Sequence, residues 1–240
     1  MKILQVRKLN KSFGGLTVIK DLDFEVDKED IFGIAGPNGA GKTTLFNLIT
    51  GFHRGQGDII FENKNIDGLK PHQICHRGIA RTFQVPQLFM SLTTFENVTV
   101  GAHFGVENGC DEKKNAREAL KIVGLEGKED AAATSLNIFD KKMTMLAAAL
   151  ATKPKLLLLD EPVGGLSPTE AKQSIAIFKK INKQLGVTIV IIEHLMKVLA
   201  ELCSQLMIIH NGEKICIGSP QEVSEHKRVI EVYLGGRLNA

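Results

Sequence analysis

The sequence predicts an α/β protein with a mostly parallel sheet, an antiparallel β group near its N-terminus and an inserted helical lobe. Two continuous apolar runs, Ile31 to Ala35 and Leu156 to Leu159, have the pattern of strands that helices cover on both faces. Short β-rich segments fill the first quarter of the chain, whereas later strands alternate with helix-length stretches. The 240 residues, of which 43% are hydrophobic, suffice for one large domain or one domain with an inserted lobe.

The first quarter of the chain predicts the antiparallel group. Its β-rich segments are bounded by turn residues, which is typical of strands joined by short connections. They are Ile3 to Arg7, Leu22 to Val26, Ile31 to Ala35 and Asp58 to Phe61. We expect Ile31 to Ala35 to be a central strand of the parallel sheet, because its apolar run does not alternate.

The stretch from about Gln84 to Ala151 carries few strand signals and predicts the helical lobe. Its helical patterns lie at Thr94 to Phe104, Asp111 to Val123 and Lys141 to Thr152. We therefore expect residues 84–151 to be inserted into an α/β core made of residues 1–83 and 152–240.

A helix start follows the second apolar run. In Ser167-Pro168-Thr169-Glu170 the serine is a suitable N-cap, proline takes the first helical position and glutamate follows three residues after the cap. The helix is expected to run to about Leu185, where Gly186 ends it. Beyond it the sequence predicts a buried strand, a hairpin around Asn211-Gly212 and a terminal helical tail, at Val187 to Ile192, Leu206 to Ile217 and from Ser219 onwards.

Composition excludes several classes of protein. The net charge is only +3, from 30 basic and 27 acidic residues, so we expect no nucleic-acid partner. No apolar run approaches the 18 or so residues of a membrane span, and any membrane role is expected to pass through a partner protein. Four cysteines lie far apart with no CxxC pair, which argues against zinc or disulfides and favours a cytoplasmic location. They are Cys75, Cys110, Cys203 and Cys216.

A glycine-rich segment between the first apolar run and a helical pattern fits GxxxxGK[ST]. In this motif the glycines let backbone N–H groups surround a phosphate. Lys42 would reach the β and γ phosphates, and Thr43 would offer its hydroxyl to Mg²⁺. A chance glycine-rich turn is the alternative, and the strand–loop–helix context disfavours it. The predicted phosphate-binding residues are Gly36, Pro37, Asn38, Gly39, Ala40, Gly41, Lys42, Thr43 and Thr44.

Two carboxylates, Asp160 and Glu161, end the second apolar run. A P-loop enzyme needs one acid to hold Mg²⁺ and a group to position the attacking water. Asp160 suits the first role and Glu161 the second. Acids at a strand end are also common as solvated loop residues, but the P-loop in the same chain favours the catalytic interpretation.

With both motifs present, the chain resembles, over essentially its whole length, the nucleotide-binding subunit of an ATP-binding cassette (ABC) transporter. The resemblance implies a P-loop NTPase fold and further site residues. Phe13 in KSFGG matches the aromatic residue that stacks on adenine, and Val18 would flank the base. Gln84 matches the glutamine that touches Mg²⁺ and relays nucleotide state to the membrane subunit. His194 matches the histidine that contacts the γ-phosphate.

Within that family, several segments resemble most closely the ATPase subunits of branched-chain amino acid importers. The resemblance implies a Mg²⁺-dependent, transport-coupled ATPase that binds ATP, works with transmembrane permease subunits and lies on the inner face of the cell membrane. It also implies a second ATPase subunit. The segments are GGL early in the chain, TGFHRGQGDI, GIARTFQVPQLFMSLTTFENV and the terminal VYLGG.

The family's signature, Leu-Ser-Gly-Gly-Gln, should begin at Leu136, but Leu136-Asn137-Ile138-Phe139-Asp140 stands there. In the family this loop contacts the γ-phosphate held by the opposite subunit. Bulky side chains replace glycines that permit close approach, and Asp140 would bring negative charge towards a polyphosphate. A helix N-cap is the milder interpretation of Asp140.

This departure leaves two hypotheses for the function. The chain retains what it supplies to its own ATP but is poorly suited to complete a partner's site, so pairing with a non-identical ATPase subunit that has an intact signature would give one competent site. The alternative is a regulatory cassette that binds nucleotide with little turnover. Intact Glu161 favours the enzyme, and the degenerate signature favours the regulator.

Other charged groups are interpreted as surface features. His72 and His76 lie four residues apart on an expected helix, and a surface pair is favoured over a metal site. The pairs Lys113-Lys114 and Lys141-Lys142 are expected to be solvated.

Overall fold

The computed structural model describes residues 1–105 and 111–234 and divides into two compact units. The first contains residues 1–71 and the described part of 188–240, and the second contains residues 72–187. We call them the P-loop unit and the helical unit. Cys110 and the end of the VYLGG segment, Gly235 and Gly236, lie outside the described residues.

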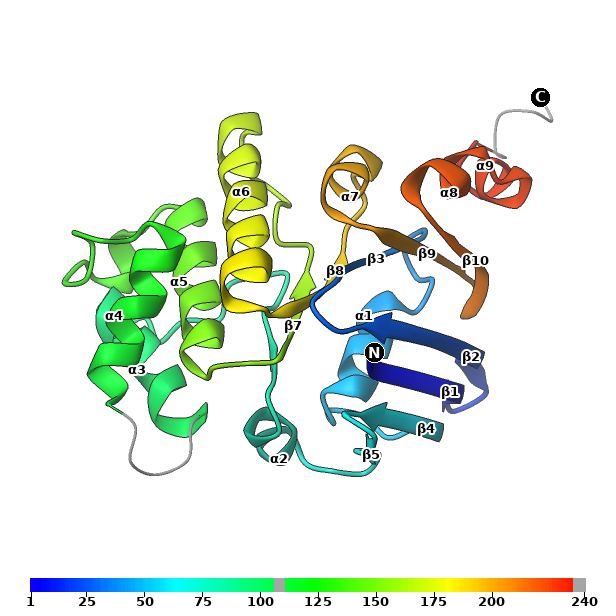
Figure 1. Cartoon of the computed structure of the whole chain (residues 1–240), viewed down its shortest axis with the longest axis horizontal. Coiled ribbons are helices and arrows are strands. Elements are labelled where there is room, and N and C mark those ends of the chain that lie inside the picture. The colour runs from blue at the N-terminus through cyan, green and yellow to red at the C-terminus, as the bar shows by residue number, and fades with distance from the viewer. Residues whose placement is uncertain (106–110, 235–240) are drawn as a thin grey trace. The chain divides into compact units, whose positions relative to one another are not determined.

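The N-terminal antiparallel sheet has the strand order β2-β1-β4-β5. Its strands are β1 (Lys2–Phe13), β2 (Leu16–Asp27), β4 (Gln56–Phe61) and β5 (Lys64–Asn65), and Figure 1 shows β1, β2 and β4 side by side. β1 and β2 pair as far as Phe13 opposite Leu16. The sequence pattern predicts only part of each strand, since shifts of register within the pair break the apolar alternation.

The other sheet of the P-loop unit contains β3 (Ile31–Ala35), β8 (Thr188–Ile192), β9 (Gln205–His210) and β10 (Glu213–Gly218). β3 pairs in parallel with both β8 and β9, and β10 pairs antiparallel to β9. Every residue of β3 and β8 is buried, which confirms the expectation from their continuous apolar runs. The helices of this unit are α1 (Lys42–Ile49), α7 (Met196–Leu202), α8 (Pro220–Glu225) and α9 (Lys227–Leu234).

The helical unit is built on α3 (Thr94–Gly105), α4 (Glu112–Val123) and α5 (Ile138–Ala151), which pack against one another. Gly101 allows α3 to approach α5 closely, because a Cβ atom there would lie 2.2 Å from the carbonyl oxygen of Ala148. β6 (Ile79–Arg81) pairs in parallel with β7 (Leu156–Asp160). The other elements are α2 (Pro71–His76), a 3₁₀ turn at Ala133–Ser135 and α6 (Pro168–Leu185).

Two helix starts in this unit follow from capping residues. α6 has the predicted capping box, in which the Ser167 hydroxyl accepts from the Glu170 N–H and the Glu170 carboxylate accepts from the Ser167 N–H. The Ser167 hydroxyl also donates to the Glu170 carboxylate at 2.6 Å, and this bond, together with the one from the Ser167 N–H, lowers the pKa of Glu170. α5 begins at Ile138, three residues before the predicted start, because Asn137 is its N-cap. α2 is the helix expected to carry His72 and His76. β6 is not predicted, since a strand this short carries little periodic signal.

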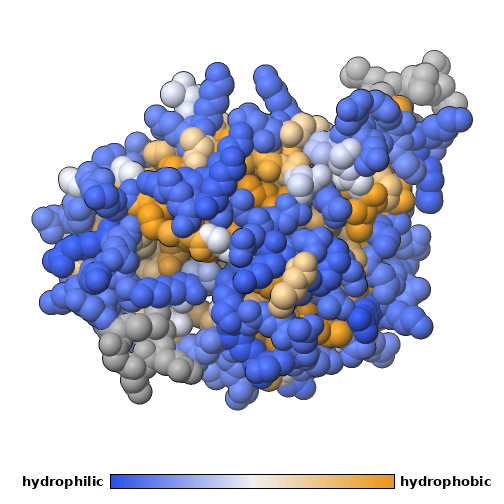
Figure 2. Space-filling model, in the orientation of Figure 1, coloured by the Kyte–Doolittle hydropathy of each residue, from blue (hydrophilic) through white to orange (hydrophobic). Residues whose placement is uncertain are grey.

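No helix in the described ranges has the length and apolar composition that a membrane span requires. The face of the molecule in Figure 2 is largely hydrophilic, with apolar side chains in separate patches. The mixed architecture of an N-terminal antiparallel sheet and a mostly parallel sheet confirms the predicted fold class.

Candidate nucleotide-binding site

The P-loop connects the buried strand β3 to helix α1. Gly39 and Gly41 have φ values of +79° and +103°, in the region that favours glycine. A Cβ atom on Gly41 would lie 2.8 Å from the carbonyl oxygen of Val18, so only glycine fits beside β2. These positive φ angles set the path of the loop into α1, whose first turn contains no acidic residue. The N-terminus of a helix without a nearby acid suits an anion.

Lys42 lies folded back into the loop. Its ammonium group donates to the carbonyl oxygens of Gly36 (2.8 Å) and Pro37 (2.9 Å), and the residue is buried. Thr43 next to it is exposed, and Thr44 is half-buried. Because neutral carbonyls are weaker partners for an ammonium than phosphate oxygens are, Lys42 is held in place yet can exchange these bonds for bonds to a polyphosphate.

Phe13 and Val18 lie in the β1–β2 hairpin. The Phe13 ring is 44% exposed, its centroid is 5.2 Å from that of His53, and the Lys11 ammonium lies 4.7 Å from it. Val18 is half-buried, and its carbonyl oxygen lies close to Gly41 and Gly212. An exposed aromatic ring on this hairpin can stack on a base. Sequence reasoning did not single out His53, which orients this ring.

The β9–β10 turn joins the hairpin to the P-loop. The Gly212 N–H donates to the carbonyl oxygen of Ala40 (3.1 Å), and the Lys20 N–H donates to the carbonyl oxygen of Gly212 (2.9 Å). Gly212 has a φ of +81°, and a Cβ atom there would lie 2.4 Å from the Val18 carbonyl oxygen. One glycine therefore holds β2 and the P-loop together.

His194 follows β8, the strand paired in parallel with β3. Because parallel strands end at the same edge of a sheet, His194 and the start of the P-loop at Gly36 lie at one edge. His194 is half-buried, and its backbone N–H donates to the carboxylate of the buried residue Glu193 at 3.2 Å.

In the helical unit, the structure brings Gln84 and Glu161 together across 77 positions of sequence. The Gln84 side-chain amide donates to the Glu161 carboxylate at 2.6 Å. Glu161 has a φ of +47°, a left-handed conformation that is uncommon for a residue with a side chain. Its carbonyl oxygen accepts a hydrogen bond of 2.9 Å from the Lys142 ammonium. Backbone conformation and two hydrogen bonds therefore fix the direction of this carboxylate.

Asp160 lies at the end of β7 in a buried ion pair with Arg81. The nitrogen–oxygen distance is 2.7 Å, and the two side chains are 3% and 5% exposed. The threonine hydroxyl of Thr43, the amide oxygen of Gln84 and the carboxylate of Asp160 are oxygen donors of the kind that Mg²⁺ binds. The donor chemistry of the predicted residues therefore fits this cation.

Arg81 and Lys142 are site residues that sequence reasoning missed. Arg81 stands in the ARTFQ run that carries the family resemblance, but nothing in the sequence shows its ion pair. Lys142 was expected to be solvated, and that expectation is wrong: it is buried and bonded to the main chain of Glu161. Lys113 and Lys114 are exposed, as expected. His72 and His76 are also exposed, and His76 Nε2 lies 2.8 Å from the carbonyl oxygen of Phe104.

Segment 136–140 forms the start of α5, and its one charged side chain, Asp140, already has a partner. The Asn137 side chain accepts from the Asp140 N–H at 2.7 Å, so Asn137 is the N-cap and the N-cap interpretation of Asp140 is wrong. The Asp140 carboxylate is buried and lies 2.6 Å from the Lys128 ammonium. Ile138 is exposed and Phe139 is half-buried. The acid is thus turned into the helical unit and neutralised there.

Comparisons with known proteins agree on one family. Residues 19–164 match the family model described as ABC transporter, and residues 213–238 match one described as branched-chain amino acid ATP-binding cassette transporter. The chain is 32% identical to the high-affinity branched-chain amino acid transport ATP-binding proteins BraF of Pseudomonas aeruginosa and LivG of Escherichia coli (strain K12). Each alignment covers 97% of this chain and 98% of the relative.

Solved structures show the same likeness. A nucleotide-free ATP-binding cassette from an ABC transporter superimposes with a TM-score of 0.89 at 30% identity, covering 97% of this chain and 99% of that one. A bacterial ABC transporter cassette with a dimeric structure gives a TM-score of 0.82 at 23% identity, covering 90% and 98%.

The fold and the P-loop define an ATP-binding cassette. The chain belongs to the ABC transporter family, whose cassettes bind and hydrolyse ATP.

Proposed function

We propose that this chain is the Mg-ATP-hydrolysing subunit of a membrane importer for branched-chain or similar amino acids. The observation that carries the proposal is its similarity, over nearly its full length, to relatives named as branched-chain amino acid transport ATP-binding proteins. The local geometry of the site is consistent with that activity, and the roles proposed for its residues follow.

ATP would be held by the P-loop unit. Phe13 and Val18 contact the adenine, and the backbone N–H groups of residues 36–44 other than Pro37 surround the phosphates. Lys42 leaves the carbonyl oxygens of Gly36 and Pro37 for the β and γ phosphates, where its charge is better matched.

Mg²⁺ would be bound by Thr43, Gln84 and Asp160, through hydroxyl, amide and carboxylate oxygens. When bound, the ion neutralises charge on the phosphates. Arg81 orients Asp160, because its ion pair at 2.7 Å fixes one carboxylate oxygen. The Gln84 amide nitrogen is bonded to Glu161, which leaves the amide oxygen as the metal-binding atom.

Glu161 would accept a proton from the attacking water, and His194 would contact the γ-phosphate. Lys142 acts as a positioning residue, because it holds the main chain from which the Glu161 carboxylate projects. Gln84 links the metal to that carboxylate through its 2.6 Å hydrogen bond. In this way one side chain contacts both the ion and the catalytic base.

The chain would work with transmembrane permease subunits, on the inner face of the cell membrane, and with a second ATPase subunit. A cassette of similar fold is dimeric. We propose a non-identical partner with an intact signature, because segment 136–140 of this chain lacks the glycines that allow a close approach to a phosphate.

The alternative is a regulatory cassette that binds nucleotide with little turnover. Its support is the ion pair of the buried Asp140 with Lys128, because Asp140 lies in the segment that occupies the position of the signature. The named relatives do not favour this alternative, since they are transport ATP-binding proteins.

The test is purification of the tagged chain from detergent-extracted membranes, followed by reconstitution of the copurifying proteins in vesicles. We expect permease proteins and a second cassette to copurify, and leucine uptake to require ATP and Mg²⁺. Chelation of Mg²⁺ should stop hydrolysis. ATP binding without turnover in the assembled complex would instead support the regulatory alternative.

A further inference from the structure

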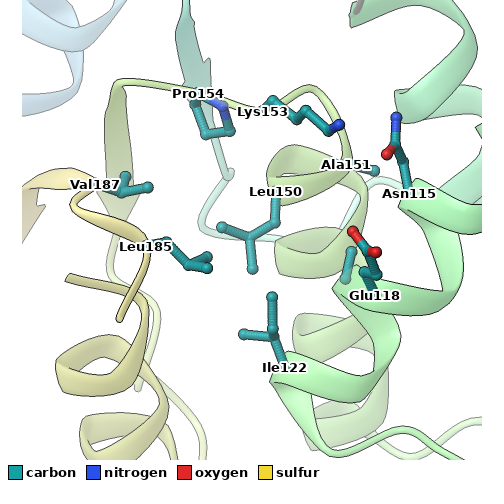
Figure 3. Close-up of a pocket in the computed structure, with 10 residues that line it drawn as sticks. Asn115, Glu118, Ile122, Leu150, Ala151, Lys153, Pro154, Leu185 and Val187 are labelled. Atoms are coloured by element: carbon teal, nitrogen blue, oxygen red, sulfur yellow. The ribbon is translucent and has the colours of Figure 1, made fainter. Parts of the chain in front are cut away.

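The helical unit contains a cavity of about 300 Å³ that the nucleotide site does not use. Side chains from α4, from the end of α5 and the residues after it, and from the end of α6 line it (Figure 3). This volume is at the lower end of the range for small-ligand pockets. The size indicates a compact metabolite rather than a nucleotide.

One part of the cavity is aliphatic. Ile122 of α4, Leu150 of α5 and Leu185 of α6 project into it, and Val187 and Ala119 complete this lining. Leu185 is 47% exposed although it is a large apolar residue at the end of its helix. A branched aliphatic group placed here would cover this side chain and lose its own contact with water.

The opposite part is polar. Asn115 of α4 is only 6% exposed, and its amide nitrogen is buried without a hydrogen-bond partner among the described residues. Such a buried donor lowers stability unless it is satisfied. Asn115 and Lys153 both line the cavity, and in the view of Figure 3 both lie above and to the right of Leu150 and Leu185. Because the nitrogen is fully covered, an oxygen acceptor on a ligand could satisfy it only after rotation of the amide about χ2.

Two opposite charges also line this polar part. Glu118 lies one turn after Asn115 on α4, and Lys153 follows the end of α5. Within the described ranges, neither side chain forms an ion pair. Lys153 has a φ of +53°, and its N–H donates to the Leu150 carbonyl oxygen at 2.8 Å, which fixes where its side chain leaves the backbone.

We propose that this cavity binds a small α-amino acid with a branched aliphatic side chain. The carboxylate of the ligand bonds to Lys153 and Asn115, its ammonium bonds to Glu118, and its side chain packs among Ile122, Leu150 and Leu185. A fatty acid would leave Glu118 unused, and an aliphatic amine would leave Lys153 and Asn115 unused. The assignment follows from the lining alone and goes beyond the proposed transport function, since it places an amino acid on the ATPase chain itself.

The test is calorimetric titration of the purified full chain with leucine, isoleucine and valine. We expect saturable binding, and binding at least about tenfold weaker for 4-methylpentanoate and 3-methylbutylamine, because each lacks one charged group. Asn115→Leu, Glu118→Gln and Lys153→Met should each weaken leucine binding by about tenfold or more. Lys114→Met and Glu126→Gln remove exposed charges outside the lining and serve as matched controls with unchanged affinity.

Several outcomes would overturn the proposal. These are no binding of leucine at millimolar concentration, equal binding of the two analogues, or leucine affinity unchanged in the three cavity variants. Thermal melting of each variant identifies loss of fold, and Glu118→Gln, which changes an exposed side chain, keeps the test valid if Asn115→Leu unfolds. ATP affinity measured on the same samples should be unchanged, so failure of this proposal is distinguishable from failure of the proposed ATPase function.

Discussion

The P-loop and segment 136–140 both lie at the start of a helix, and in the family both approach phosphate, yet they are built in opposite ways. The P-loop has glycines at positive φ and no acid in the first turn of α1. Segment 136–140 has no glycine and places Asp140 in the first turn of α5. One helix start is left open to an external anion, while the other already holds an internal one.

The cations near the two segments differ in the same way. The Lys42 ammonium donates to two neutral carbonyl oxygens, those of Gly36 and Pro37, and a polyphosphate can replace these two. Lys128 is held by the buried carboxylate of Asp140 at 2.6 Å. Exchanging that partner for a phosphate would leave a carboxylate buried without its cation, which is costly. Whether a helix start can bind phosphate therefore depends on how readily the nearby lysine can exchange the partner that it already has.

The largest expected effect on ATP binding is that of Lys42→Ala. Removing the ammonium deletes charge-assisted hydrogen bonds to the phosphates, so ATP affinity should fall by about a hundredfold or more. Calorimetry with ATP measures it, and Lys64→Ala, at an exposed site on β5, is the control. Unchanged affinity would mean that the P-loop is not the nucleotide site.

Glu161→Gln should preserve ATP binding and lower turnover by between about 10² and 10⁴-fold, because an amide cannot accept the proton of the attacking water. The measurement is ATP hydrolysis by the reconstituted complex, with nucleotide affinity determined in parallel. Hydrolysis at the parent rate would assign the role of the base to another residue.

Restoring the family signature in segment 136–140 tests this comparison most directly. Asn137→Ser, Ile138→Gly, Phe139→Gly and Asp140→Gln, introduced together into Glu161→Gln, should increase ATP-dependent dimerisation. Flexible backbone donors would replace bulky side chains and the acid would be removed. Sedimentation with and without Mg-ATP measures this effect. The two added glycines should also lower stability by about 1 kcal/mol each.

The control is Glu161→Gln with its native segment. Strong ATP-driven homodimers of that control would show that Phe139 and Asp140 are tolerated in a shared site. That result would contradict the non-identical partner and weaken the regulatory alternative.

The smallest expected effect is that of Lys128→Met. It leaves the buried Asp140 carboxylate without its cation, and we expect a loss of stability of about 1–3 kcal/mol, towards the lower end because Lys128 itself is half-exposed. Thermal unfolding measures it, with Lys121→Met as the surface control. A melting temperature equal to that of the parent would show that the pair does not stabilise the start of α5.

Local sequence patterns predicted the features that depend on neighbouring residues. The buried strands β3 and β7, the capping box of α6 and the P-loop follow from composition and spacing within a few residues. The ion pair of Arg81 with Asp160 joins residues 79 positions apart, and the pair of Lys142 with the Glu161 carbonyl joins residues 19 apart. No local pattern carries such contacts, because the fold decides which surfaces meet. For the same reason Lys142 was mistaken for a solvated residue.

Gly212 fixes how far the β1–β2 hairpin lies from the P-loop. Its N–H and carbonyl groups join the P-loop at Ala40 to β2 at Lys20, and its missing side chain lets both approach. The separation between the hairpin that carries Phe13 and the loop that carries Lys42 is therefore set by three backbone segments rather than by adaptable side chains. In the proposed site, with the base at Phe13 and the phosphates at Lys42, this fixed separation would exclude a ligand whose base and phosphates are spaced differently.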